Sequence, residues 1–444
     1  MEPQVKLRIP RSLFEKIIKD LRREHEFAFE RAGFTFGRVK KLGEDQFIVF
    51  LNEYLPVDDN NYIDDKSVGA RINSAAITSA MQITFGGSKS TFHTHLHDFE
   101  YDDAMPQFSV VDREELPPIA KSAMSFAPDQ VHGCIVLSGN SINAVVFLPG
   151  YDRPFKPIQI SIVGYPMVFS FPVSPLLTSK GDRYSRQSFL GEKAQDLISR
   201  IKIGVVGLSG GGSHIFQQLA HIGFKRYVLF DKQVVDLSNT NRLVGSTLKD
   251  VKNKTPKFVV ARRLIKSLVP DAQIEGGQML WQESPELLQG CDIVVGSLDT
   301  FAGRRDLEGE CRRFLMPYLD IGMDILKSGD EPYNMFGQVQ LSMPGEPCMI
   351  CRGFLSEENL AREANRYGDA GDRPQVVWAN GILASSAIGV LIDLITDWTA
   401  EKNRQVYLSY EGNRGTLNKH IKLDYQKLGD CEHYRVSDTG PVRL

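Results

Sequence analysis

A glycine-rich turn between an apolar strand and a helix constrains this chain more than any other feature. The apolar run 202–206 predicts a buried strand, Gly207-Leu208-Ser209-Gly210-Gly211-Gly212 follows it, and residues 213–222 have the apolar spacing of a helix. Glycines at such a turn allow a tight change of direction, and they let backbone N–H groups and the helix N-terminus face phosphate or ribose oxygens. The turn therefore predicts a nucleotide site.

The same alternation of strand and helix continues along the chain. Further strands are expected at 227–230 and 292–295, and a helix at 257–268. Alternation of this kind predicts a largely parallel sheet with helices on both faces.

The first 165 residues show a different pattern. Leu13, Ile17 and Leu21 lie on one face of a predicted helix. Short β-like runs bounded by Gly, Asn or Pro follow it, at 34–36, 47–51, 134–138 and 144–148. The chain therefore starts with a mixed α/β region rather than with a strand–helix repeat.

A proline-punctuated segment, 166–175, separates the two patterns. The length of 444 residues allows two or three domains with substantial cores. We therefore expect an α/β protein with domains at 1–170 and 183–444, joined by a linker at 171–182.

Composition excludes some partners. The 52 Lys and Arg residues nearly balance the 55 Asp and Glu residues, and no basic block gives nucleic acid a binding face. The N-terminus lacks the apolar core of a signal peptide, and the longest apolar stretch, 382–395, is too short to span a bilayer. Six cysteines do not make a disulfide framework. We expect a cytoplasmic protein that binds neither membrane nor nucleic acid.

Residues that suit a nucleoside triphosphate accompany the glycine-rich turn. Asp231 ends the next strand, where an acidic residue holds a ribose hydroxyl. Ser209 stands where a simple dinucleotide fingerprint has glycine, which weakens an NAD interpretation. Arg242 and Lys257 suit phosphates, and Asp299, directly after a buried strand, suits Mg²⁺. The set favours a triphosphate over a dinucleotide.

This set resembles the ThiF/MoeB/ubiquitin-activating family, from Arg183 almost to the C-terminus. The resemblance implies a Rossmann-like domain, ATP as cofactor and Mg²⁺ at Asp299. It implies that the turn and its neighbours bind the nucleotide: Gly207, Gly210 and Gly212 around it, Asp231 on the ribose, and Asn239, Arg242 and Lys257 on the phosphates. Arg186 resembles the family's arginine finger, which the other subunit of a homodimer usually supplies.

The activity that this resemblance implies is adenylation. The C-terminal carboxylate of a ubiquitin-like β-grasp carrier protein attacks the α-phosphate of ATP, which yields an acyl-adenylate and pyrophosphate. Catalysis of this kind is mostly positioning and charge neutralisation. Each basic residue alone is better explained as surface charge or a helix cap, but the ordered set favours the nucleotide site.

A second candidate site, a group of histidines, lies in the first domain, in Phe92-His93-Thr94-His95-Leu96-His97. Residues two apart on a strand point to the same face, so His93 and His95 can contact one ion. Together with Asp112 and a water they make a tetrahedral catalytic zinc site with one position open for chemistry. Glu30 is the candidate base for the zinc-bound water.

These residues resemble the JAMM (MPN+/JAB) metalloprotease family, whose mixed α/β domain has a cytidine-deaminase-like fold. The resemblance implies Glu30 as general acid/base, His93, His95 and Asp112 as zinc ligands, and Ser109 as the oxyanion stabiliser. Such enzymes cleave peptide or isopeptide bonds after the C-terminal glycine of ubiquitin-like proteins.

The chain departs from the family pattern between His95 and Ser109, which 13 residues separate, a longer gap than is usual in the family. The gap holds an acidic insertion, 97–105, that we interpret as a substrate-reading loop or a lid. Two alternatives stay open. His97 lies on the same strand face and competes as a ligand, and Ser109 and Asp112 merely cap a helix.

The cysteines predict a second zinc ion, with a structural role. Cys348 and Cys351 resemble the first half of the adenylating family's zinc site, and Cys431 and His433 can complete a Cys₃His tetrahedron. Zinc there would connect the C-terminal segment to the rest of the second domain. The alternative is that the cysteines pack without a metal.

Many members of the adenylating family carry a further cysteine that accepts the activated acyl group. The corresponding stretch here, 375–381, has none, and no cysteine lies between Cys351 and Cys431. Cys311, beside two arginines, is the one other arguable thiol. We therefore predict adenylation without a thioester on this chain, with transfer to a separate thiol or amine.

Together the two sites predict a bifunctional enzyme of a prokaryotic ubiquitin-like conjugation system. One domain would trim the carrier to its terminal glycine or release it from a target, and the other would activate that glycine. The expected partners are a β-grasp carrier and a separate transfer enzyme with an acceptor thiol. Two rivals stay open: sulfur-carrier activation through a thiocarboxylate, and a scaffold with a dead metal site that docks a carrier.

Overall fold

The computed structural model describes residues 2–24, 30–65, 69–97, 105–139, 141–178, 182–327, 330–365, 374–396, 398–399, 405–425 and 431–441. These residues form two compact units. The first contains 2–175 with two segments from later in the chain, 313–315 and 435–441, and the second contains 176–312 and 316–434. The division after Pro175 falls inside the predicted linker, and the last segment of the chain belongs to the first unit.

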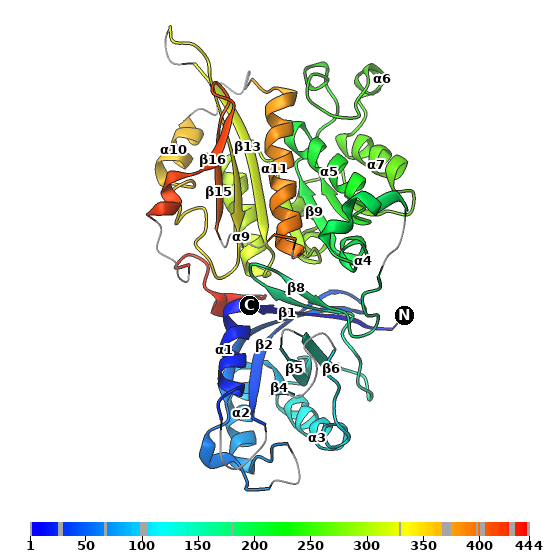
Figure 1. Ribbon diagram of the computed structural model, residues 1–444, viewed down its shortest axis with the longest axis vertical. Coiled ribbons are helices and arrows are strands. Elements are labelled where there is room, and N and C mark those ends of the chain that lie inside the picture. The colour runs from blue at the N-terminus through cyan, green and yellow to red at the C-terminus, as the bar shows by residue number, and fades with distance from the viewer. Residues whose placement is uncertain are drawn as a thin grey trace. The chain divides into compact units, whose positions relative to one another are not determined.

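The first unit is built on an eight-stranded mixed sheet with the order β6-β5-β4-β2-β3-β1-β7-β8 (Figure 1). Its strands are β1 (Gln4–Pro10), β2 (Ala32–Gly43), β3 (Gln46–Pro56), β4 (Ser90–Leu96), β5 (His132–Ser138), β6 (Ser141–Phe147), β7 (Gln159–Val163) and β8 (Val168–Ser170). β4 pairs antiparallel with β2 and parallel with β5, and all of its residues are buried. The strand with the predicted histidines is thus internal to the sheet.

Three helices accompany this sheet: α1 (Arg11–Leu21), α2 (Ser74–Gly87) and α3 (Val110–Phe126). The predicted apolar face of α1 is buried. The helix α2 was not predicted, and α3 was expected only in the alternative in which Ser109 and Asp112 cap a helix; each of the two begins at a capping side chain. The Asn73 side chain accepts hydrogen bonds from two N–H groups of α2, and Ser109 forms a capping box with Asp112 at the start of α3.

The second unit is built on another eight-stranded sheet, with the order β11-β10-β9-β12-β13-β14-β15-β16. The strands are β9 (Lys202–Val206), β10 (Arg226–Phe230), β11 (Gln273–Gly277), β12 (Ile293–Gly296), β13 (Tyr318–Leu326), β14 (Asn334–Ser342), β15 (Val406–Glu411) and β16 (Thr416–Lys419). The first five strands of that order are parallel, and β14, β15 and β16 add antiparallel.

The prediction of a largely parallel sheet therefore holds for one half of this sheet. The rest of the sheet departs from the prediction because of a short connection between two of its strands. The β13–β14 link is too short for a crossover, and such a link joins antiparallel strands. In the parallel half, β9 lies between β10 and β12, so the strand order reverses at its carboxyl end. Ligands of open α/β sheets bind at such a point.

The helices of the second unit follow the strand–helix alternation. They are α4 (Ala194–Arg200), α5 (Gly210–Ile222), α6 (Leu248–Lys252), α7 (Lys257–Leu268), α8 (Pro285–Gln289), α9 (Phe301–Arg313), α10 (Glu357–Asn365) and α11 (Val377–Ile395). A 3₁₀ segment, η2 (Asp182–Leu190), precedes α4. The Rossmann-like fold of this unit is thereby confirmed.

The apolar stretch 382–395 lies in α11, which is longer than the sequence pattern indicated. By length and a mean hydropathy of 1.6, α11 is the one helix among the described residues that qualifies as a membrane span. It packs against α5, β13 and β14 (Figure 1), and 61% of its apolar window is buried. Core packing therefore explains its composition.

Candidate functional site

The glycine-rich turn joins β9 to α5 at the reversal point. Gly207 has a φ of +88°, and a Cβ there would lie 2.3 Å from the carbonyl oxygen of Ser297. A Cβ on Gly212 would lie 1.9 Å from the carbonyl oxygen of Gly207. Neither position accepts a larger residue. The turn consequently passes close to the end of β12, and α5 begins at Gly210, within the turn itself.

Asp231 follows β10 and lies beside this turn. Its carboxylate accepts hydrogen bonds from the N–H groups of Leu208 (2.9 Å) and Gln233 (2.8 Å). One carboxylate thus connects the turn to the chain leaving the next strand. A carboxylate has about four acceptor positions, so it retains capacity for a ribose hydroxyl.

The predicted phosphate and magnesium residues line a single pocket of about 510 Å³, a volume typical of small-molecule sites. Asn239, Arg242, Lys257 and Asp299 all contribute to its lining. Lys257 is 2% exposed, and its Nζ donates to Gln233 Oε1 (2.5 Å). Burial lowers the pKa of its ammonium, and the carboxylates of Asp231 and Asp299 oppose that shift.

Arg242 is partly satisfied within the protein. Its Nη1 donates to the Ser238 carbonyl (2.6 Å) and to Asn241 Oδ1 (3.0 Å), whereas its buried Nε has no hydrogen-bond partner among the described residues. A buried guanidinium nitrogen without an acceptor is costly, and a phosphate oxygen would satisfy it. The pocket therefore fits the polyphosphate that the sequence predicted.

A second pocket shares Ser209, Asp299 and Gln375 with the first. It also contains Arg304, which forms an ion pair with the buried Asp320. The Tyr318 hydroxyl donates to the other oxygen of that carboxylate (2.8 Å). The sequence analysis did not single out Asp320, because this aspartate lies inside the mostly apolar strand β13 and has no motif around it.

Arg186, the predicted arginine finger, lies in η2 and is exposed. It is not among the described residues that line either pocket. Its proposed action from a second subunit stays a prediction.

No thiol lies near the nucleotide pocket. All six cysteines are among the described residues, and none lines either pocket. Cys311 is fully buried in α9, as Cys291 is before β12. Cys351 is the one exposed cysteine of the six, and it belongs to the cluster described next. Adenylation without a thioester on this chain stays a prediction.

The four predicted structural zinc ligands lie together in the second unit. The Sγ of Cys351 lies 3.6 Å from Cys348 Sγ, 3.8 Å from Cys431 Sγ and 3.3 Å from His433 Nδ1, and Cys348 Sγ lies 3.6 Å from the same nitrogen. The hydrogen bond from Cys348 lowers the pKa of the Cys431 thiol to about 4, against the effect of burial.

These separations match the edges of a zinc tetrahedron. Zinc–sulfur bonds of about 2.3 Å and zinc–nitrogen bonds of about 2.0–2.1 Å give edges of about 3.8 Å between sulfurs and about 3.6 Å between sulfur and nitrogen. Three thiols and one imidazole are also a common structural donor set. The cluster, which we call the cysteine cluster, therefore fits zinc.

The first unit holds a second cluster of donors on β4. His95 Nε2 lies 3.2 Å from His97 Nε2, and Asp112 Oδ2 lies 3.5 Å and 3.6 Å from these two nitrogens. Glu30 Oε1 lies 3.8 Å from His97 Nε2. We call Glu30, His95, His97 and Asp112 the histidine cluster. The structure thus places His97 beside both carboxylates.

His93 lies further back on the same face of β4. Its ring centroid is 5.5 Å from that of His95, and its ring packs edge-on against Phe34 at 5.6 Å. Burial lowers the pKa of His93 to about 3, which keeps the imidazole neutral. The predicted pair His93 and His95 is therefore not the pair nearest to Asp112 and Glu30.

Burial raises the pKa of the Glu30 carboxyl to about 7. Burial acts in the same sense on Asp112, but its hydrogen bond with His95 and the N–H of Ser109 outweigh it and lower the pKa of Asp112. Asp112 also accepts from the N–H of Ser109 (2.7 Å), while Ser109 Oγ accepts from the N–H of Asp112 (3.1 Å). The capping alternative is thus realised, and the same aspartate also faces the histidines.

The histidine cluster also fits a divalent cation. Zinc bonds of about 2.0–2.2 Å to nitrogen and oxygen give tetrahedral edges of about 3.3–3.6 Å, close to the separations above. The buried Nδ1 of His95 has no hydrogen-bond partner among the described residues, so Nε2 is the nitrogen that faces the other donors. Residues 98–104 of the acidic insertion lie outside the described residues.

Comparison with known families addresses the second unit. The profile of the ThiF family matches residues 183–432, more than half of the chain. The chain belongs to the ThiF family. The matched range starts where the sequence resemblance started, and it includes the glycine-rich turn, the predicted phosphate-binding residues and most of the cysteine cluster.

Several characterised proteins resemble this ThiF-family chain. It is 31% identical over 175 residues to the SAMP-activating enzyme E1 of Haloferax volcanii, and the aligned region covers 38% of this chain and 61% of that enzyme. It is 28% identical over 190 residues to ubiquitin-like modifier-activating enzyme 5 of Dictyostelium discoideum, with 37% and 46% covered. It is 32% identical over 128 residues to the sulfur carrier protein adenylyltransferase of Thermus thermophilus, with 28% and 46% covered.

The chain thus spans less than two thirds of the length of each of these relatives. Among solved structures, E. coli MccB with succinimide aligns with a TM-score of 0.46 and 20% identity, over 59% of this chain and 75% of MccB.

Proposed function

We propose that this chain uses ATP to adenylate the C-terminal glycine of a ubiquitin-like β-grasp carrier protein. The observation that carries the proposal is the pocket at the carboxyl edge of the parallel strands, which contains the buried Lys257, the unsatisfied Nε of Arg242, and Asp299. The names of the relatives, which are activating enzymes and an adenylyltransferase, support the same reaction.

In the proposed reaction the carrier's terminal carboxylate attacks the α-phosphate of ATP, and pyrophosphate leaves. Asn239, Arg242 and Lys257 orient the phosphates and neutralise their charge, and Asp231 accepts from the ribose. Asp299 would hold Mg²⁺, which screens the triphosphate when bound. The N-terminus of α5 adds N–H groups that favour an anion.

Carrier-dependent ATP–pyrophosphate exchange tests this proposal. Asp299→Ala should lower exchange by about 100-fold or more, because charge stabilisation in the site is lost. Asp306→Ala removes an exposed carboxylate on the neighbouring helix α9 and is the matched control. Exchange that persists in Asp299→Ala would contradict the assignment of the pocket.

The acceptor of the acyl group is proposed to be a thiol or an amine on another protein, because no cysteine lines the nucleotide pocket. The alternative acceptor is a sulfur donor, which would give a carrier thiocarboxylate. Intact-mass measurement of the carrier after reaction distinguishes them, since a thiocarboxylate and a lysine conjugate differ in mass. A reductant-sensitive adduct between this chain and the carrier would contradict both.

A second activity, zinc-dependent cleavage after the carrier's terminal glycine, is proposed for the first unit. The observation that favours it is the histidine cluster, in which His95 Nε2, His97 Nε2 and Asp112 Oδ2 lie 3.2–3.6 Å from one another and Glu30 Oε1 lies 3.8 Å from His97 Nε2. His95, His97 and Asp112 would hold the zinc ion, which acidifies a bound water. Glu30, with its pKa raised to about 7, can take a proton near neutral pH, and Ser109 stays the candidate oxyanion stabiliser.

Cleavage of a carrier–lysine isopeptide or of an extended carrier precursor tests the second activity. Glu30→Gln should abolish turnover while zinc content stays at the wild-type level. If Glu30→Gln cleaves as the wild type does, or if the wild type neither binds zinc there nor cleaves, the first unit is the non-catalytic scaffold instead.

The two activities together make a bifunctional enzyme of a prokaryotic ubiquitin-like system, active in the cytoplasm as a homodimer that uses Arg186 in trans. The cysteine cluster is proposed to hold a structural zinc ion. A monomer that is fully active in solution would contradict the dimer.

A further inference from the structure

The short segment from Glu30 to Ala32 is fixed by contacts on both sides of Glu30. The N–H of Glu30 donates to the carbonyl oxygen of Gly69 (2.9 Å). The N–H of Ala32 donates to the Tyr62 hydroxyl (2.9 Å), which donates in turn to the Ala32 carbonyl (3.2 Å). The backbone of this segment therefore has little freedom to shift along the sheet.

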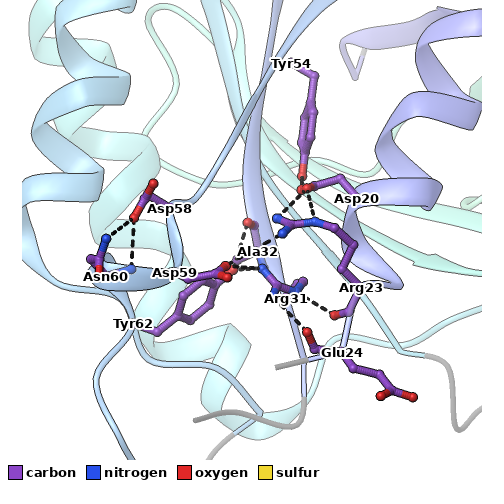
Figure 2. A network of polar contacts seen from close by, with 10 residues as sticks. All are labelled: Asp20, Arg23, Glu24, Arg31, Ala32, Tyr54, Asp58, Asp59, Asn60 and Tyr62. Carbon is purple, nitrogen blue, oxygen red and sulfur yellow. Dashed lines mark hydrogen bonds and ion pairs between the residues drawn. The ribbon is translucent and has the colours of Figure 1, made fainter. Parts of the chain in front are cut away.

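Arg31, between these two residues, has a buried guanidinium that joins three chain segments (Figure 2). Its Nε donates to the Arg23 carbonyl (2.5 Å), its Nη2 to the Glu24 carbonyl (3.0 Å), and its Nη1 to Asp59 Oδ1 (2.6 Å). Its side chain is 3% exposed. Burying a guanidinium is costly unless its donors are paired in a fixed fork, so these three bonds define where the segment lies.

The same network continues into α1 and β3. Arg23 Nε donates to Asp20 Oδ1 (2.9 Å), and the Tyr54 hydroxyl donates to Asp20 Oδ2 (2.7 Å), as Figure 2 shows. Arg31 is thus linked through Arg23 and Asp20 to α1 and β3.

Gly69 lies directly against the Glu30 side chain. A Cβ added at Gly69 would lie 2.5 Å from both Cδ and Oε2 of Glu30. The backbone at Gly69 therefore passes closer to this carboxylate than any larger residue would allow. No other glycine in the described residues would place a Cβ against Glu30.

We propose that Arg31, Asp59, Tyr62 and Gly69 are positioning residues that hold the Glu30 carboxylate against the metal-binding face of His95 and His97. Two elements do this. The hydrogen bonds of Arg31 and Tyr62 fix the backbone on either side of Glu30. The absence of a side chain at Gly69 leaves the space that the Glu30 carboxylate occupies. This inference rests on the proposed zinc-dependent activity of the first unit.

Gly69→Ala is the sharpest test, because it should displace the flexible end of Glu30 without touching the zinc ligands. Gly86→Ala, on α2, is the matched control, since a Cβ there meets no atom within 4 Å. Arg31→Lys is a second variant that keeps the positive charge but loses the fork. The full-length chain is used, with Co²⁺ in the histidine cluster and zinc in the cysteine cluster.

Two readouts are compared with Glu30→Gln. The d–d absorption spectrum of bound Co²⁺ reports the surroundings of the metal-bound water, and steady-state cleavage separates kcat from KM. In Gly69→Ala and Arg31→Lys we expect the spectral change of Glu30→Gln, a kcat lowered by about tenfold or more, and a KM within about threefold of wild type. Gly86→Ala should match wild type in both.

Two results would overturn the inference. If Co²⁺ binds and Glu30→Gln is inactive, but Gly69→Ala and Arg31→Lys keep the wild-type spectrum and kcat, the positioning role is refuted while the zinc activity stands. If the wild type binds no Co²⁺ at the histidine cluster, both proposals fail.

Discussion

The cysteine cluster and the histidine cluster are the two candidate metal sites among the described residues, but they are built differently. The cysteine cluster joins chain segments about 80 residues apart, at Cys348–Cys351 and Cys431–His433, with donors from the protein alone. The histidine cluster takes His95 from the buried strand β4 and His97 from just beyond its end, and its carboxylates from the residues before β2 and from the first turn of α3.

The difference bears on the separate roles proposed for the two clusters, one structural and one catalytic. A closed set of thiolates completes its tetrahedron with protein ligands and connects distant segments, which stabilises the fold. In the histidine cluster one of the donors, Glu30, is a carboxyl whose pKa is raised to about 7 by burial. A group that gains and loses a proton near neutral pH is suited to proton transfer rather than to permanent ligation.

The largest expected effect is on stability, from the cysteine cluster. Cys351→Ser removes an exposed ligand whose side chain does little packing, so its effect should come through the metal. We expect one zinc ion fewer per chain and a Tm lowered by about 10 °C, since a structural zinc contributes several kcal/mol to folding. Metal analysis and thermal unfolding check this. If one zinc is lost but the Tm does not change, the cysteine cluster does not contribute to stability.

The next effect concerns ligand identity in the histidine cluster. His97→Ala should weaken zinc binding by about 100-fold, whereas His93→Ala, whose ring lies behind the cluster, should change it by less than about tenfold. Competition with a zinc chelator of known affinity measures both. Weaker binding in His93→Ala than in His97→Ala would restore the ligand set that the sequence resemblance implied.

A smaller effect is kinetic. A chelator added to the zinc-loaded wild type should remove zinc in two phases, about tenfold or more apart in rate, with the histidine cluster emptied first because its site keeps an open position. The phase lost in Cys351→Ser should be the slow one. A single phase would remove the distinction between a closed and an open site.

The smallest effect concerns Ser109, which caps α3 and orients Asp112. Ser109→Ala should cost about 1 kcal/mol of unfolding free energy, as the loss of a helix cap does. If Ser109 also stabilises the oxyanion, kcat should fall by more than about tenfold while zinc binding stays within about threefold of wild type. A variant that loses stability alone would leave Ser109 as a cap.

Local sequence patterns predicted the features that depend on spacing along the chain. The apolar face of α1, the strands β9 and β10, and the turn between β9 and α5 lie where they were expected. The four members of the cysteine cluster could also be named, because Cys-x-x-Cys and Cys-x-His each place two donors on one short segment.

The choice between His93 and His97 could not be made in the same way. Three histidines at spacing two share one strand face, and the pair that meets Glu30 depends on the β2–β4 register, in which Ala32 pairs with His95. Register is a tertiary property, as are the antiparallel strands β14–β16 and the ion pair of Asp320 with Arg304. None of these has a signal in a single stretch of sequence.

The membership of residues 435–441 in the first unit has a consequence for how this protein can be divided. The Asn52 amide on β3 donates to the carbonyl oxygen of Ser437 (3.2 Å), so the first unit is completed by a segment that follows the second unit in the chain. In topological terms the ThiF unit is an insertion in the first unit, tethered at both ends. A fragment ending at residue 170 would lack the segment 435–441, which begins two residues after His433 of the cysteine cluster.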